Sequence, residues 1–138
     1  MKILLLRFLL FFLIGTTNTN SAEKKIEKQQ TEKVAVSIIS LISQPKEYQE
    51  KRIRVWGYIE IKSNHNILYF HKEDYKYNIT KNGLWIDFSQ AIKLHKDAYN
   101  HTYVMLEGTF NTHYGALGMC SGSLTQVDRI MSWKQINK

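Results

Sequence analysis

Apolar residues alternate with polar and aromatic residues over 52–61, which is the pattern of a strand with one buried face. Shorter patterns of the same kind follow at about 67–70, 84–88, 103–110 and 123–130, and the last of these is the most irregular. The chain is therefore predicted to be mainly β, with five short strands.

A helix is expected before the first strand, over 34–43, because apolar residues there recur at helical spacing. The stripe consists of Val34, Ile38, Leu41 and Ile42. Pro45 ends this helix, since the residue before a proline is kept out of helical geometry. The stripe makes the helix amphipathic, so one of its faces has to be buried.

A second helical segment is expected over 90–100, between the third and fourth strands. One or two helical turns there would place Ala91, Leu94 and Ala98 on the inner side. The sequence thus predicts two helical segments, one before the first strand and one inside the β region.

A glycine interrupts the apolar row of two predicted strands, in "VWGYI" (55–59) and in "LEGTF" (106–110). A side chain at Gly57 or Gly108 would point inward and collide with the opposite wall of a small barrel, whereas glycine permits a bulge or a kink. Five strands, a coiled first strand and the helical connection together predict a five-stranded OB-like barrel with an N-terminal amphipathic helix. Gly57 is expected to form the corner of this barrel.

The first 21 residues have the features of a secretory signal peptide. Lys2 and Arg7 flank the start of an apolar region whose continuous run covers 8–14, and small and polar residues follow it. This run is much shorter than the ~20 residues needed to span a bilayer, so a membrane anchor is disfavoured. Cleavage is expected near Ser21 and leaves no transmembrane segment, which makes the mature protein periplasmic or secreted.

Residues 22–33 are expected to form a charged tether that precedes a barrel domain over 34–138. The formal net charge of +7 falls to +5 without Lys2 and Arg7, and the remaining charges are spread along the chain. A nucleic-acid interface normally gathers Lys and Arg on one face, so nucleic acid is not an expected partner.

The stretches "SIISLISQPKEYQEKRIRVWGYIEI", "ILYFHKEDYKYNITKNGLWIDFS" and "YVMLEGTFNTHYGALGMCSGSLTQVDRI" occur in this order along the chain. In order and content they resemble a group of small exported bacterial proteins of uncharacterised function, over about 34–130. The resemblance implies an OB-like barrel preceded by a helix and a signal peptide, and it implies no catalytic residues. The chain departs from the group at "YQEKR", where an Asp-Gly-type turn is usual.

Four aromatic residues are expected on the outer face of the predicted barrel, from their alternation with inward apolar residues. They are Trp56, Tyr58, Trp85 and Tyr103. OB barrels commonly bind ligands on the outer face of central strands, and exposed aromatic clusters often mark a contact site. Two interpretations stay open: the face binds a ligand or partner, or the helix over 34–43 covers it.

The connection "HKEDYKYNITKNG" (71–83) is far longer than a tight hairpin needs, and connections of this length are often functional. Tyr75 and Tyr77 make it a candidate recognition segment, because tyrosines give a large contact area with little flexibility to lose. The adjacent Glu73 and Asp74 point in different directions, which favours a surface turn or short helix over general acid–base catalysis.

The motif "GMCSG" (118–122) has the glycine spacing of a nucleophile elbow, with Cys120 as the nucleophile. A strand-like segment follows it where an elbow requires a helix, so a hairpin loop is favoured. As the single cysteine, Cys120 is expected to be a buried thiol, and an intermolecular disulfide is the alternative. The histidines lack the paired spacing of zinc ligands, so neither a metal nor another cofactor is expected. They are His65, His71, His95, His101 and His113.

The sequence therefore predicts an exported, non-catalytic binding module rather than an enzyme. A protein partner in the cell envelope is the first expectation, by analogy with other exported modules of this size. Binding of a saccharide or small polar ligand on the outer face is the second. A small hydrolase that uses the Cys120 thiol or a metal held by histidines is the opposing alternative.

Overall fold

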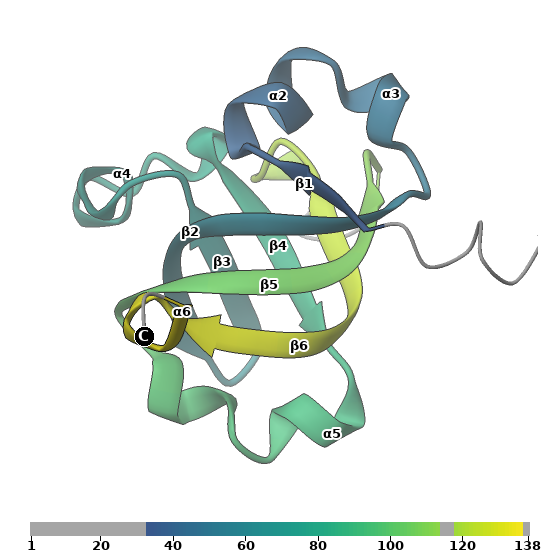
Figure 1. Ribbon diagram of the computed structural model, residues 1–138. Helices are drawn as coiled ribbons and strands as arrows, with labels where there is room; N and C mark the ends of the chain where they lie inside the picture. The colour runs from purple at the N-terminus through teal and green to yellow at the C-terminus, as the bar shows by residue number, and fades with distance from the viewer. Residues whose placement is uncertain (1–32, 114–117, 137–138) are drawn as a thin grey trace, which may run out of the picture. The chain divides into compact units, whose positions relative to one another are not determined.

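The computed structural model describes residues 33–113 and 118–136 (Figure 1). The strands are β1 (Val34–Val36), β2 (Arg52–Lys62), β3 (His65–Tyr69), β4 (Gly83–Phe88), β5 (Thr102–Asn111) and β6 (Ser123–Ser132). The helices are α2 (Ile38–Ser43), α3 (Pro45–Tyr48), α4 (Lys72–Lys76), α5 (Gln90–Lys93) and α6 (Trp133–Ile136), with 3-10 turns η1 (Thr80–Asn82) and η2 (Lys96–Tyr99). The predicted signal peptide, and the predicted tether as far as residue 32, lie outside these residues. None of the helices in the described ranges is long and apolar enough to cross a membrane.

Five of the strands close into a barrel, which confirms the predicted fold class. Their order is β2-β3-β4-β6-β5, and β5 pairs back onto β2. The pairing of β4 with β6 is parallel, whereas the other four pairings around the barrel are antiparallel. This is the connectivity of an OB-type Greek-key barrel. Inward apolar residues of all five strands form one core.

The prediction of a helix over 34–43 is wrong for its first part. Val34–Val36 forms the additional strand β1, which runs parallel to β2 with Val34 opposite Ile53. The helix starts only after Ser37, whose hydroxyl accepts a hydrogen bond from the amide of Ser40 at 3.0 Å. Two valines favour an extended backbone, and a serine cap fixes the helix start after them.

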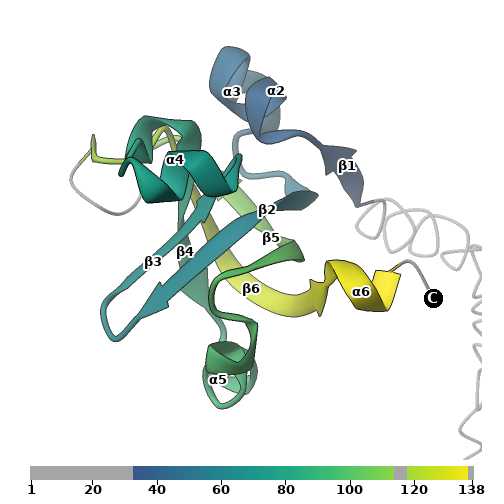
Figure 2. The same cartoon turned by 90° about the vertical axis from the view of Figure 1, so that its left-hand side faces the viewer.

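Helix α2 closes one end of the barrel and does not cover the aromatic outer face. Ile38 and Leu41 are buried and belong to the barrel core. Both views place α2 at one end of the barrel and α5 at the other (Figure 2). The alternative in which this helix covers the aromatic face is therefore wrong.

The predicted helical connection between the third and fourth barrel strands is present as two short helices, α5 and η2. Its inner side is not the predicted one, because Ala91, Leu94 and Ala98 are exposed. Ile92 and Tyr99 pack against the core instead. Ile92 and Tyr99 are seven residues apart and so share a helical face, but the prediction was made for the neighbouring face that carries the two alanines.

Gly57 lies where the neighbour on one edge of β2 changes from β1 to β3. The strand pairs with β5 over its first part, and pairing with β3 begins only at Tyr58. A Cβ at Gly57 would lie 2.4 Å from the carbonyl oxygen of Tyr69 and 2.9 Å from Cγ of Leu68. The predicted lack of space is confirmed, although the atoms that fill it come mainly from the adjacent strand β3.

Gly108 has a similar constraint at the pairing of β5 with β6. A Cβ there would lie 2.8 Å from both the carbonyl oxygen of Thr125 and Cγ of Leu124. The register of the two strands shifts between Glu107 and Thr109, and Gln126 on β6 has a φ of 52°. The glycine and the bulge together let β6 bend from β5 towards β4.

We expect a Gly57→Val substitution to lower the free energy of unfolding by roughly 1–3 kcal/mol or more, because its side chain would overlap packed backbone. Ser63→Val is the matched control, since Ser63 lies in the exposed turn between β2 and β3. Thermal melts of the two variants and the parent measure the effect. A Gly57→Val melting temperature within a degree or two of the parent value would contradict this packing.

Candidate functional site

Three of the predicted site residues meet on the outer face of β2 and β5. Tyr58 and Tyr103 are opposite each other in the strand register, and their ring centroids lie 5.3 Å apart. Tyr75, from α4, lies 5.4 Å from Tyr58 by the same measure. Tyr58 is buried beneath these neighbours, whereas Tyr103 stays 40% exposed. Tyr58 is thus a support for the face rather than part of its surface.

Hydrogen bonds to the buried side chain of Asp74 hold helix α4 in position. One carboxylate oxygen of Asp74 accepts from the backbone amide of His71 at 2.9 Å, and the other accepts from the side-chain amide of Asn82 at 2.8 Å. The long connection is therefore a fixed structure that holds Tyr75 against the barrel. Asp74 acts here as a helix cap and structural acceptor.

A cavity of about 380 Å³ opens beside this aromatic group. Its side-chain lining is almost wholly aromatic, and the backbone of β2 and β5 forms its floor. The lining residues are Trp56, Gly57, Phe70, His71, Tyr103, Val104 and Trp133. We call this cavity the aromatic groove. Gly57 contributes backbone atoms to this floor, since a side chain at this position would point inward, towards Leu68 and Ile38.

Three of the aromatic side chains that line the groove were not predicted from the sequence. Phe70 and His71 lie at the junction of β3 and α4, and their rings are in contact at 4.1 Å between centroids. Trp133 begins α6 and is 52% exposed. A tryptophan in the mostly polar segment 132–138 was the available signal for this residue.

Two predicted site residues lie away from the aromatic groove. Tyr77 is 66% exposed, and the Lys76 ammonium lies 5.2 Å from the centre of its ring. Trp85, on β4, packs edge-on against His65 at 5.4 Å. The structure therefore brings together Trp56, Tyr58, Tyr103 and Tyr75 but not the other two.

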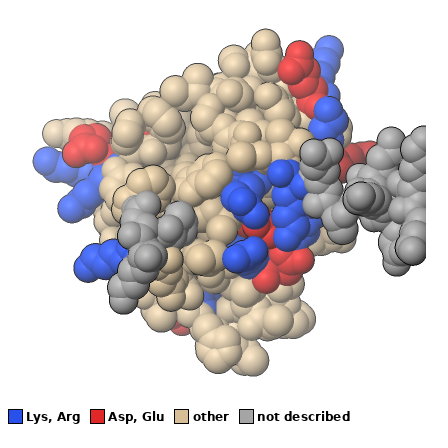
Figure 3. Space-filling model, viewed as in Figure 1, with Lys and Arg blue, Asp and Glu red and all other residues tan. Residues whose placement is uncertain are grey.

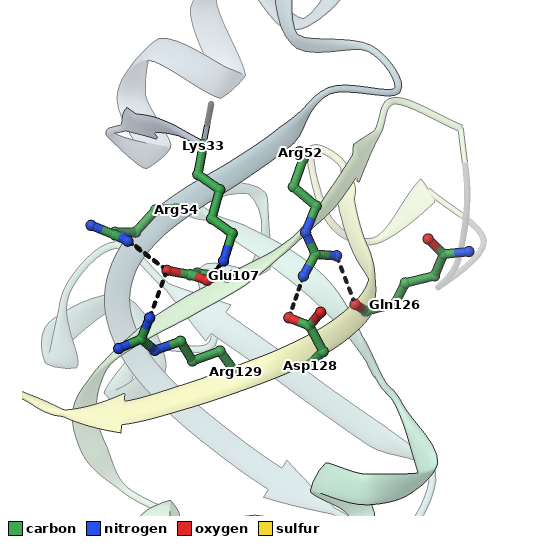
Figure 4. Close-up of polar contacts among 7 residues, drawn as sticks. All are labelled: Lys33, Arg52, Arg54, Glu107, Gln126, Asp128 and Arg129. Carbon is green, nitrogen blue, oxygen red and sulfur yellow. Dashed lines mark hydrogen bonds and ion pairs between the residues drawn. The ribbon is translucent and has the colours of Figure 1, made fainter. Parts of the chain in front are cut away.

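A buried carboxylate with several cationic partners lies on the same outer face, farther along β2 and β5 (Figure 4). Glu107 is fully buried, and its Oε1 lies 2.7 Å from Nη2 of Arg54 and 3.6 Å from Nη1 of Arg129. Its Oε2 pairs with Lys33. Burial acts to raise the pKa of Glu107, but hydrogen bonds from Lys33 and Arg54 outweigh it and keep the pKa below the ordinary value.

This group, which we call the Glu107 cluster, carries excess positive charge. Lys33, Arg54 and Arg129 surround a single carboxylate. The neighbouring Arg52 is neutralised, because it pairs with Asp128 and donates to the carbonyl of Gln126 at 3.1 Å. Figure 3 shows the Lys and Arg atoms gathered around acidic atoms, next to a large uncharged area.

Cys120 does not have the environment of a nucleophile. Burial raises the pKa of its thiol to about 11, against a smaller opposing effect of Lys81. The segment after it enters β6 directly, so the strand-to-helix turn of an elbow is not formed. Within the described ranges, no group of three or more His, Cys, Asp or Glu residues could hold a metal ion.

Comparison with known proteins gives little further information. No family model and no curated protein matches the chain. Among solved structures it is similar to a "putative aspartyl-tRNA synthetase" from Leishmania major Friedlin, with a TM-score of 0.47 and 12% sequence identity. The match covers 81% of this chain and 26% of that protein. A similarity at this level does not indicate a shared activity.

We expect Cys120 to react slowly with iodoacetamide in the native protein at neutral pH. Only the thiolate reacts, and a thiol with a pKa of about 11 is almost fully protonated at pH 7. The rate should keep rising above about pH 8.5, where an ordinary thiol begins to level off. Mass spectrometry of the labelled fraction measures the rate, and denatured protein is the control. Rapid native labelling at pH 7 would restore the thiol-hydrolase alternative.

We expect Glu107→Gln to lower the free energy of unfolding at pH 7 by about 1–3 kcal/mol, because the cations lose their buried partner. The folded pKa of Glu107 is lowered, so its contribution is complete above the unfolded pKa and is lost as the pH falls through the folded pKa. The difference between parent and variant should therefore close as the pH falls below about 4.

Urea unfolding over a series of pH values tests this dependence, with Asp128→Asn as the matched control. Asp128 is 57% exposed, so loss of its pair with Arg52 should cost less than about 1 kcal/mol. Equal losses of unfolding free energy in Glu107→Gln and Asp128→Asn would contradict the expectation that the buried ion pair stabilises the fold more than the exposed one.

Proposed function

We propose that the protein is an exported binding module, periplasmic or secreted, which recognises a protein partner of the cell envelope through the aromatic groove. The observation that supports this most directly is the cavity of about 380 Å³ with aromatic walls. Energetically important contacts between proteins are concentrated in such pockets and are rich in Trp, Tyr and Arg. The groove offers Trp56 and Trp133 together, and Arg54 lies two residues before Trp56 on β2.

The shape and lining of the groove favour an apolar side chain as its occupant. The strand backbone at Gly57 and Val104 forms a fixed floor, and Tyr103 is held by a hydrogen bond between its hydroxyl and the amide of Lys72 at 3.2 Å. Rigid walls lose little entropy on binding, so apolar area buried there converts well into affinity.

The buried carboxylates are bound to other groups of the protein, which supports a non-catalytic role. In the described part of the chain Asp74 caps a helix, Glu107 is paired with cations, and Glu60 pairs with Lys62 at 2.6 Å. A general acid or base needs a carboxyl group within hydrogen-bond reach of the substrate. Each of these three groups already has structural partners.

We expect Trp133→Ala to weaken partner binding by roughly thirtyfold, which corresponds to about 2 kcal/mol for a central aromatic contact. The protein is immobilised and exposed to an envelope extract, the captured partner is identified, and its affinity is then measured with purified components. Trp85→Ala is the matched control, because Trp85 is an outer-face tryptophan that lies outside the groove.

Equal binding by the parent and Trp133→Ala would show that the partner uses another surface. Capture of a soluble saccharide fraction with the same dependence on Trp133 would replace the protein partner with the second expected ligand class. Thermal melts of both variants confirm that each remains folded.

A further inference from the structure

We propose that the aromatic groove and the Glu107 cluster form one composite site, whose occupant is an extended protein segment with an apolar residue and an Asp or Glu two positions apart. This inference rests on the proposed function and adds the chemistry of the partner. The apolar side chain enters the groove, and the carboxylate binds the guanidinium groups of Arg54 and Arg129.

The first support is the position of both halves on one row of side chains. Residues that point outward from β2 are opposite residues that point outward from β5, so that Arg54 pairs with Glu107 and Trp56 with Met105. Side chains two residues apart on a strand are about 7 Å apart. Arg54, the first cation of the Glu107 cluster, is therefore the next outward residue of β2 after the groove residue Trp56.

The second support is the unused hydrogen-bonding capacity of the arginines. Arg54 directs Nε and Nη2 at Glu107, at 2.9 Å and 2.7 Å. Arg129 reaches Glu107 only through Nη1, at 3.6 Å, and its side chain is 49% exposed. A guanidinium has five N–H donors, so both groups keep donors that can reach an incoming carboxylate.

The third support is the charge balance, which favours one or two acidic side chains over a polyanion. Three cations face one carboxylate, which leaves an excess of two positive charges, and Asp128 already neutralises Arg52. Nucleic acids and anionic glycans present a repeated row of charges and are normally met by a longer basic track. An apolar surface beside a small cationic group is complementary to an acidic, apolar peptide.

The spacing of the motif follows from strand geometry. A segment that lies extended along β2 repeats its own side chains every two residues on the face that meets the barrel. An apolar residue in the groove then places the residue two positions away over Arg54. If the apolar and acidic residues were adjacent in the sequence, the carboxylate would point away from the barrel surface.

The test uses a phage-displayed library of random dodecapeptides, selected on the protein expressed as the full chain and purified as the cell produces it. We expect enriched peptides to carry a large apolar residue and an Asp or Glu separated by one residue. For a selected peptide, replacement of Asp or Glu by Asn or Gln should weaken binding about tenfold. The loss should shrink at high salt.

Variants of the protein separate the two halves of the site. Arg129→Gln should weaken the selected peptide about tenfold but leave its Asn-substituted or Gln-substituted form unchanged. Lys93→Gln, which removes the same charge from the exposed end of α5, is the matched control and should have no effect. Trp133→Ala should weaken both forms of the peptide.

The outcomes distinguish failure of this inference from failure of the proposed function. Peptides that need Trp133 but show no acidic preference and no response to Arg129→Gln would overturn the composite site and leave the groove as a binding site. A library without enriched peptides would overturn the extended segment as occupant, whereas the proposed function fails only if partner capture does not depend on Trp133. Binding of heparin, used as an anionic glycan probe, with dependence on both Trp133 and Arg129 and without peptide enrichment would also overturn the peptide assignment.

Discussion

Strand β2 is hydrogen-bonded to three other strands, and its ability to reach all of them depends on the missing side chain at Gly57. On one edge it pairs with β5 over most of its length, and on the other it pairs first with β1 and then with β3. The change from β1 to β3 occurs around Gly57, where the carbonyl of Tyr69 comes within 2.4 Å of the position a Cβ would take. A side chain there would separate β2 from β3, and the closed barrel requires that contact.

The same strand determines the chemistry of the outer face. Because its inward positions hold the core residues, its outward positions present Arg54, Trp56 and Tyr58 in one row. The cation, the groove wall and the buried aromatic support therefore have fixed spacing that does not depend on loop conformation. Sites on strands are held more precisely than sites on loops.

The barrel could be predicted from the sequence because its signals are local. Alternation along each strand and glycines in the inward rows of 55–59 and 106–110 are visible within ten residues. The strand β1 was missed because three residues give too short a pattern, and its valines also fit a helical stripe. Short apolar runs are ambiguous between helix and strand until the neighbouring edge is known.

The candidate site was less predictable because its parts are distant in the sequence. Lys33 and Glu107 are 74 residues apart, and Arg54 and Glu107 are 53 apart. No local pattern indicates that these charges meet. Trp133 joins the groove only because α6 turns back beside β5 and β6 (Figure 1). The aromatic alternation on β2 and β5 was sufficient to predict Trp56, Tyr58 and Tyr103 on one face, but it also included Trp85, which packs elsewhere.

The charges on β6 are unevenly compensated, as the proposed binding role of the outer face would require. Asp128 and Arg129 are neighbours, yet only the first completes a neutral pair, with Arg52. Arg129 adds a third cation to a carboxylate that Arg54 and Lys33 already satisfy, at a distance of 3.6 Å and with half of its side chain exposed. Such a contact contributes little to folding, and the added positive charge repels its neighbours. The next outward pair along β5 and β6 is the buried Met105 with the half-buried Met131, so the uncompensated charge borders apolar side chains. A partner that supplies both a carboxylate and an apolar side chain would relieve the repulsion and remove the apolar area from water in a single contact.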